Sequence, residues 1–109
     1  MRLLAGLLLA GAAQAQVVEC PQTIKEAPAV NLTGGSMYDG PNHEYELIGT
    51  PKGAKGRHYG FDGRAVKWLA CWYGRDGKVA WWKMDAKATS CSVGEQRKAG
   101  RVSVRAVCK

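Results

Sequence analysis

The four cysteines of this 109-residue chain carry its clearest chemistry. They are Cys20, Cys71, Cys91 and Cys108; none belongs to a C-x-x-C pair, and their spacing matches no zinc-binding pattern. An even number of cysteines in a small exported domain is typical of disulfides, so we predict two of them. The four residues allow three connectivities. We favour Cys20–Cys71 with Cys91–Cys108, because the second pair brackets an apparent terminal hairpin.

The remaining chemistry-bearing residues form no catalytic or metal-binding pattern. His43 and His58 are expected in loops. Neither the glutamates beside His43 nor Asp62, four positions after His58, predicts a metal site or an acid–base pair. Once the cysteines are paired no thiol nucleophile remains, and no serine stands in a G-x-S-x-G context. We therefore predict a protein that is not an enzyme, with no catalytic residue, no cofactor and no metal.

A basic, glycine-rich stretch at residues 49–63 reads GTPKGAKGRHYGFDG. Its composition suits phosphate, but it lacks the G-K-[ST] ending of a phosphate-binding P-loop. We expect a long surface loop with a short strand at 58–59, and two interpretations remain open: a loose anion-binding loop, or a solvated segment without a ligand. The candidate anion-binding residues are Lys52, Lys55, Arg57 and Arg64.

The first 15 residues have the pattern of a cleaved signal peptide. Arg2 supplies a positive start, residues 3–13 are apolar, and Ala13-Gln14-Ala15 is a small-x-small cleavage site. The apolar run is shorter than the ~20 residues that span a bilayer. We therefore expect residues 16–109 to be a single domain in the periplasm or outside the cell, with no transmembrane segment.

Charge is distributed unevenly along the expected mature chain. Residues 16–50 hold one basic and five acidic residues, whereas residues 51–109 hold 14 basic and four acidic residues. Such a balance favours acidic proteins, lipid headgroups or anionic polysaccharide as partners. The alternative is a solvated surface whose two halves partly neutralise each other. An export signal disfavours nucleic acid as a partner.

Short apolar or alternating runs interrupted by glycine recur along the chain and predict a mainly β protein, a small antiparallel sheet or a sandwich- or barrel-like domain with little helix. We expect residues 22–35 to be mostly loop, with a short strand at 29–32, and residues 94–100 to be a polar turn. The other expected strands are 17–20, a brief one ending at 39, 45–48, 65–73, 78–84, 89–93 and 101–108.

The sequence KWLACWYGRDGKVAWW, residues 67–82, predicts an aromatic hairpin that turns at Asp76-Gly77, a favoured type I′ dipeptide. One face should hold Leu69, Cys71, Tyr73, Ala80, Trp82 and Met84, which we assign to the core. The opposite face should hold Trp68, Ala70, Trp72, Val79, Trp81 and Lys83, with Lys67 and Lys78 nearby in sequence. Two interpretations of this second face stay open: another core layer, or a partly exposed binding face formed by Trp68, Trp72, Trp81 and Lys83.

Several short motifs occur together in the chain: V-x-C-P-x-x-I at 18–24, S-x-Y-D-G-P at 36–41, W-L-x-C-x-Y at 68–73, then Cys91 and Cys108. In this combination the chain resembles a family of short, exported, disulfide-containing, uncharacterised proteobacterial proteins. The resemblance covers most of residues 17–108 and implies disulfides and the periplasm of a Gram-negative bacterium. It implies no activity, cofactor or site. Ala106 departs from the family's closing motif, and the basic glycine-rich stretch is not one of its features.

These patterns together favour a small exported protein that binds a protein partner, as an inhibitor or immunity-like module does. The small size, the export signal, the expected disulfides and the tryptophan–lysine face favour this interpretation. The alternative is an envelope-associated protein whose basic C-terminal half binds anionic glycan or lipid headgroups.

Overall fold

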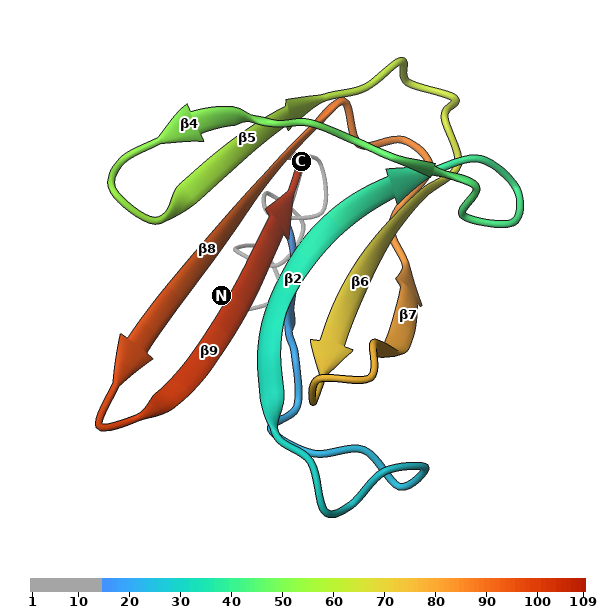
Figure 1. Cartoon of the computed structure of the whole chain (residues 1–109). Coiled ribbons are helices and arrows are strands. Elements are labelled where there is room, and N and C mark those ends of the chain that lie inside the picture. Colours follow the sequence, from blue (N-terminus) through green and yellow to red (C-terminus); the bar gives the residue numbers. More distant parts are fainter. Residues whose placement is uncertain (1–14) are drawn as a thin grey trace, which may run out of the picture.

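Nine strands in two antiparallel sheets make up the fold in a computed structural model, which describes residues 15–109 (Figure 1). The five-stranded sheet has the order β1 (Gln16–Glu19), β9 (Arg101–Cys108), β8 (Ser90–Lys98), β5 (Gly56–Gly60), β4 (Thr50–Lys52). The four-stranded sheet has the order β3 (Tyr45–Glu46), β2 (Leu32–Asp39), β6 (Lys67–Tyr73), β7 (Lys78–Lys83). There is no helix in this part of the chain, which confirms the prediction of a mainly β protein.

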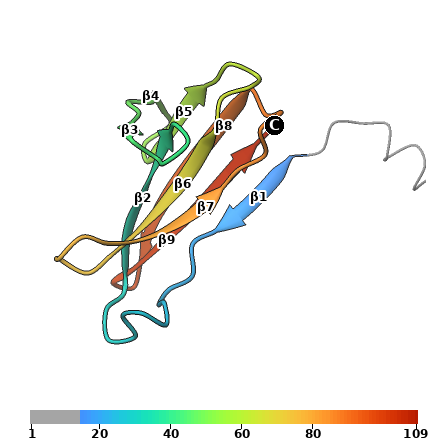
Figure 2. The same ribbon diagram turned by 90° about the vertical axis from the view of Figure 1, so that its right-hand side faces the viewer.

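The two sheets form two layers around the core. Figure 2 shows β6 and β7 in front of β8 and β9, and the contact between the sheets runs mainly from β2 to β9 and β8. On β9 every second side chain is buried, as its alternating sequence predicts. The most deeply buried large side chains are Tyr73, Lys67, Met37, Leu69 and Val104.

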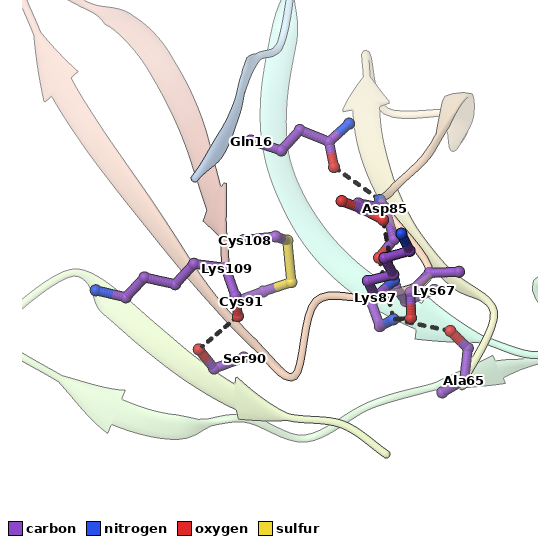
Figure 3. Close-up of a disulfide and its surroundings, with 10 residues drawn as sticks. Gln16, Ala65, Lys67, Asp85, Lys87, Ser90, Cys91, Cys108 and Lys109 are labelled. Carbon is purple, nitrogen blue, oxygen red and sulfur yellow. Dashed lines mark hydrogen bonds between the residues drawn. A yellow bond between two sulfur atoms is a disulfide. The ribbon is translucent and has the colours of Figure 1, made fainter. Parts of the chain in front are cut away.

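Both disulfides have the predicted pairing. Cys20 follows β1 and is bonded to Cys71 on β6, so this bridge joins the two sheets. Cys91 and Cys108 lie opposite each other on β8 and β9, with their Cα atoms 4.0 Å apart (Figure 3). No cysteine among residues 15–109 is free.

The glycine-rich segments form more strand than we predicted. β2 begins at Leu32, so Gly34 and Gly35 lie inside a strand and not in a loop, and the expected strand at 29–32 is absent. The segment is a strand because it pairs with β6. Packing between the sheets favours glycine in it, since a Cβ atom on Gly35 would lie 2.6 Å from Cγ1 of Val104 on β9. Glycine at this position lets β2 approach the other sheet closely.

Two further segments also correct the predicted boundaries. Residues 49–63 are not one long loop, because β4 and β5 form a hairpin and β5 continues the sheet by pairing with β8. Likewise β8 extends to Lys98, and the turn before β9 contains only Ala99 and Gly100, both with positive φ. The strand predicted at 45–48 is limited to Tyr45–Glu46.

Gly35→Ala is expected to lower the free energy of unfolding by about 1–3 kcal/mol, the usual cost of overpacking a tight core. The added methyl group must displace Val104 or separate the sheets. Gly94→Ala is the matched control, because a Cβ atom at Gly94 in β8 meets no atom within 4 Å. Urea unfolding of the two variants measures the difference, and equal stability would contradict a requirement for glycine at position 35.

Stability is also expected to fall as the pH rises above about 10. Burial raises the pKa of Tyr38, Tyr59 and Tyr73 above 10.0, so the fold favours the neutral phenols. This contribution is complete below the unfolded-state pKa and disappears as the pH passes through the raised values. Burial lowers the pKa of Lys67 from 10.5, which acts in the opposite direction and reduces the loss that the three tyrosines cause. Urea unfolding at pH values from about 9 to 11 measures the sum; a flat profile would contradict it, and Tyr73→Phe should reduce the loss.

Candidate functional site: an aromatic face

The aromatic hairpin has the predicted register, which fixes the face on which each side chain lies. Leu69 pairs with Trp82 and Trp72 pairs with Val79, so even positions oppose odd ones. The connection is the four-residue loop 74–77. The expected type I′ turn at Asp76-Gly77 does not form, because only glycines in this loop, Gly74 and Gly77, have positive φ. The assignment of the two faces is therefore correct although the turn type was wrong.

Trp82 corrects the predicted core. Leu69, Cys71 and Tyr73 are fully buried as expected, but Trp82 remains 40% exposed. Strand β7 is the edge of its sheet, and the opposite sheet packs mainly on β2. A side chain on the core side of a hairpin therefore stays partly exposed where the opposite sheet does not extend over it.

Four aromatic rings from three strands gather on the opposite, outer side of the four-stranded sheet. Tyr38 on β2 pairs with Trp68 on β6, and Trp81 on β7 pairs with Ala70 at the centre. The Tyr38 ring lies edge-on to Trp81, with centroids 4.8 Å apart, and 6.4 Å from Trp72. Trp68, Trp72 and Trp81 are all partly buried.

His43 completes this cluster from the loop between β2 and β3. Its ring stacks on Trp81 with centroids 3.7 Å apart and an interplanar angle of 10°, and its edge meets Trp68 at 5.3 Å. The backbone of His43 has a positive φ of 46° and its N–H donates to the carbonyl of Gly40. Sequence reasoning placed His43 in a loop without a role. Nothing in its local sequence signals the stacking, because the partner lies 38 positions away.

Hydrogen bonds hold two of the indoles in place. Nε1 of Trp68 donates to the carbonyl of Gly40 at 2.8 Å, and Nε1 of Trp72 donates to Oγ of Ser36 at 3.0 Å. Beneath the rings Ala70 is fully buried, although it points away from the other sheet. No further strand of the described residues covers this surface. We call Tyr38, His43, Trp68, Trp72 and Trp81 the aromatic face.

Charges of both signs border the aromatic face. Nζ of Lys83 lies 5.8 Å from the centre of the Trp68 ring, within the range of a cation–π contact. On the opposite edge Glu46 pairs with Tyr38. The pKa of Tyr38 is raised by burial and further by the nearby Glu46 carboxylate. The surface is therefore aromatic at its centre, with one basic and one acidic side chain at opposite edges.

Lys67, which is near these tryptophans in sequence, does not belong to that border. It is fully buried, and its ammonium group donates to three carbonyls, those of Ala65 at 2.8 Å, Ala86 at 3.0 Å and Asp85 at 3.2 Å (Figure 3). Burial lowers its pKa, opposed by the carboxylates of Asp85 and Asp62. Its role is structural, because it ties the loops before β6 and after β7 together. Lys78 pairs with the core residue Tyr73 and so is not part of the outer face.

The four candidate anion-binding residues do not form one cluster. Lys52 donates to Oγ of Ser92 on the outer side of the five-stranded sheet. Arg57 lies on the inward-facing side of that sheet, opposite Val93, and donates to the carbonyl of Gly49. With Lys55 it lines a cavity of about 240 Å³ that Glu95 also lines, so the charges there are mixed. Arg64 lies outside the hairpin, in the connection between β5 and β6.

The described residues contain no group of three or more His, Cys, Asp or Glu side chains able to hold a metal ion. His58 is exposed and lies on β5, not in a loop as expected. No helix in residues 15–109 is long and apolar enough to cross a membrane. The expected signal peptide lies outside the described residues, apart from Ala15 at its end.

The aromatic face is thus the strongest candidate site, because it combines partly exposed large rings with a fixed geometry. The residues predicted for it from sequence, Trp68, Trp72, Trp81 and Lys83, lie together, and the structure adds Tyr38 and His43. No family model, curated protein or solved structure matched the chain.

Proposed function

We propose that this is an exported, non-catalytic protein whose aromatic face binds a protein partner, as an inhibitor or immunity-like module does. The observation that carries the proposal is the preformed cluster on the outer side of the four-stranded sheet. The indoles of Trp68 and Trp72 are hydrogen-bonded in place, and His43 stacks on Trp81. Rings that are already ordered lose little conformational freedom on binding.

The composition of the face supports a protein partner. Tryptophan and tyrosine dominate the binding energy of protein interfaces, where a ring of polar groups excludes water from a central aromatic cluster. Here the centre is aromatic, and Lys83 and Glu46 supply charges of opposite sign at the edges. A border with charges of both signs does not select for a polyanion.

Export is supported by the cross-links. Two disulfides are consistent with an oxidising, extracytoplasmic location. Cleavage after Ala15 would leave β1 complete, since it begins at Gln16 and pairs there with Cys108. The Gln16 side chain also accepts a hydrogen bond from the backbone N–H of Asp85 (Figure 3).

Trp81→Ala should weaken capture of the partner by at least tenfold, as expected for a central interface tryptophan. The oxidised protein is used as bait on periplasmic extract and culture medium, and the captured protein is then purified and titrated against each variant. Trp82→Ala is the matched control. It removes an exposed tryptophan from the same strand but from the other face, and should change affinity by less than about twofold.

Thermal unfolding of both variants accompanies the titration, because Trp81 also covers Ala70. A folded Trp81→Ala variant with wild-type affinity would contradict the proposal. So would an equal loss of affinity in the two tryptophan variants. Should Trp81→Ala fail to fold, His43→Ala gives the same test, since it removes only the ring stacked on the outside of the cluster.

A further inference from the structure

The outer side of the five-stranded sheet is basic, in contrast to the aromatic face. Because Val102, Val104 and Ala106 are buried, the alternate residues of β9 point outward, and among these are Arg101 and Arg105. In the same register Lys98 lies opposite Arg101, and Lys52 reaches this side from β4. We call Lys52, Lys98, Arg101 and Arg105 the basic face.

Acidic residues are scarce on this side of the sheet. Glu19 on β1 lies opposite Arg105, with its carboxylate 4.0 Å from the guanidinium, and both side chains are mostly exposed. Such an exposed pair is weak and is screened by salt, so it leaves Arg105 available to an anion. The basic face therefore has an excess of positive charge.

A hollow of about 570 Å³ lies on this side of the sheet. One cross-strand row runs from Lys52 through Gly56 and Gly94 to Arg105. The row therefore has one cation at each end and two glycines, which have no side chain, between them. Above Gly94 a Cβ atom would meet nothing within 4 Å. Besides Gly94 and the apolar residues Cys20, Val104 and Val107, the hollow is lined by polar or charged side chains: Glu19, Gln22, Ser92, Gln96, Ser103 and Arg105.

Lys52 is already directed toward this hollow. Its ammonium group donates to Oγ of Ser92, 40 positions away in sequence, at 3.1 Å. Three strand spacings separate Lys52 from Arg105 in the row, which places their backbones about 14 Å apart. An occupant that meets both cations must carry negative charge at more than one point along its length.

We propose that the basic face binds an anionic glycan, a polysaccharide chain with carboxylate or sulfate groups, laid across the hollow at Gly94. The cations would pair with its charged groups. The hydroxyls of Ser92 and Ser103 and the amide of Gln96 would hydrogen-bond its hydroxyl groups. This site is separate from the aromatic face and does not depend on the function proposed for that face.

The side chains of this face fit a glycan better than the other polyanions. No tryptophan, tyrosine or phenylalanine of the described strands points outward here, so single-stranded nucleic acid would find no ring on which to stack. Six of the ten residues that line the hollow have polar or charged side chains, whereas a lipid surface is bound through a large apolar face. Repeated charge with many hydroxyl groups is the chemistry of an acidic polysaccharide.

The test is a titration of the oxidised protein with polygalacturonate for carboxylates, dextran sulfate for sulfates and neutral dextran as the control polymer. We expect binding to one or both anionic polymers, weakened by salt, and none to dextran. Gly94→Leu fills the hollow without removing a charge and should weaken binding at least tenfold. Lys52→Gln with Arg105→Gln should do the same. Lys78→Gln with Lys83→Gln removes two charges elsewhere and should change affinity by less than about twofold.

Each alternative outcome would overturn the proposal. If the anionic polymers are attracted non-specifically to a basic protein, Gly94→Leu should bind them with unchanged affinity and both double variants should lose affinity equally. Binding to vesicles of anionic phospholipid but to neither polymer would assign the face to a membrane surface, and binding to neither would remove the site. Should Gly94→Leu fail to fold, the two double variants decide between the outcomes. Trp81→Ala should retain polymer binding, which separates this test from that of the aromatic face.

Discussion

Replacing Cys20 and Cys71 together by alanine is expected to lower the free energy of unfolding by about 4 kcal/mol. The bridge spans 51 positions of sequence, so it removes much conformational freedom from the unfolded chain. It also joins the end of β1 to the fully buried centre of β6. A domain of this size has a total stability of roughly 5–15 kcal/mol, so the variant should be close to unfolded at elevated temperature.

The second disulfide provides the internal control. Cys91 and Cys108 enclose 17 positions and join two strands that already pair, so their replacement should cost about 3 kcal/mol on the same chain-entropy basis. Urea unfolding monitored by tryptophan fluorescence measures both variants. A reversed order of the two losses would contradict the entropic explanation. An unchanged melting temperature of the native protein in strong reductant would contradict any stabilisation by the bridges.

The elements predicted most accurately are those whose side chains alternate in polarity. Strand β9 shows alternation along its whole length, and the register of β6 with β7 follows from the even number of residues in their connection. The local pattern is sufficient there because strands that follow each other in the sequence also pair with each other. The cysteine pairing followed from the same hairpin reasoning, since Cys91 and Cys108 lie on consecutive strands.

The glycine-rich strands could not be predicted in this way. Glycine carries no side chain, so Gly34 and Gly35 in β2 and the glycines of β5 show no alternation of polarity. Their conformation is set by pairing with distant strands and by the approach of Val104 to Gly35. The same holds for the edge of the sheet, where local pattern places Trp82 on the correct face and only the three-dimensional fold shows that the opposite sheet leaves it 40% exposed.

The aromatic face was predictable in part. Trp68, Trp72 and Trp81 share one face by register alone, whereas Tyr38 and His43 arrive through the pairing of β2 with β6 and the fold of the following loop. The structure also shows that no further strand of residues 15–109 covers this surface as a second core layer would. The rings bury Ala70 between them and remain partly exposed themselves.

Lys67→Met is expected to lower the free energy of unfolding by about 3 kcal/mol, which is within the range for a hydrogen-bonded charged group. Methionine has a similar length and fills the space, but it cannot donate to the carbonyls of Ala65, Asp85 and Ala86. These carbonyls belong to two loops that no disulfide joins directly. The loss of the ammonium group should therefore loosen both loops as well as reduce global stability.

Lys83→Met is the matched control, because Lys83 is exposed and its loss should change stability by no more than about 0.5 kcal/mol. Urea unfolding gives the global effect, and hydrogen exchange at the amide of Met84, which donates to the Lys67 carbonyl, gives the local one. Burial lowers the pKa of Lys67, so the charged form has a desolvation cost that its three acceptors and the carboxylates of Asp85 and Asp62 offset. If Lys67→Met is instead as stable as the native protein, the desolvation free energy of the ammonium group cancels the free energy of its hydrogen bonds. The lysine would then add nothing to the stability of the fold.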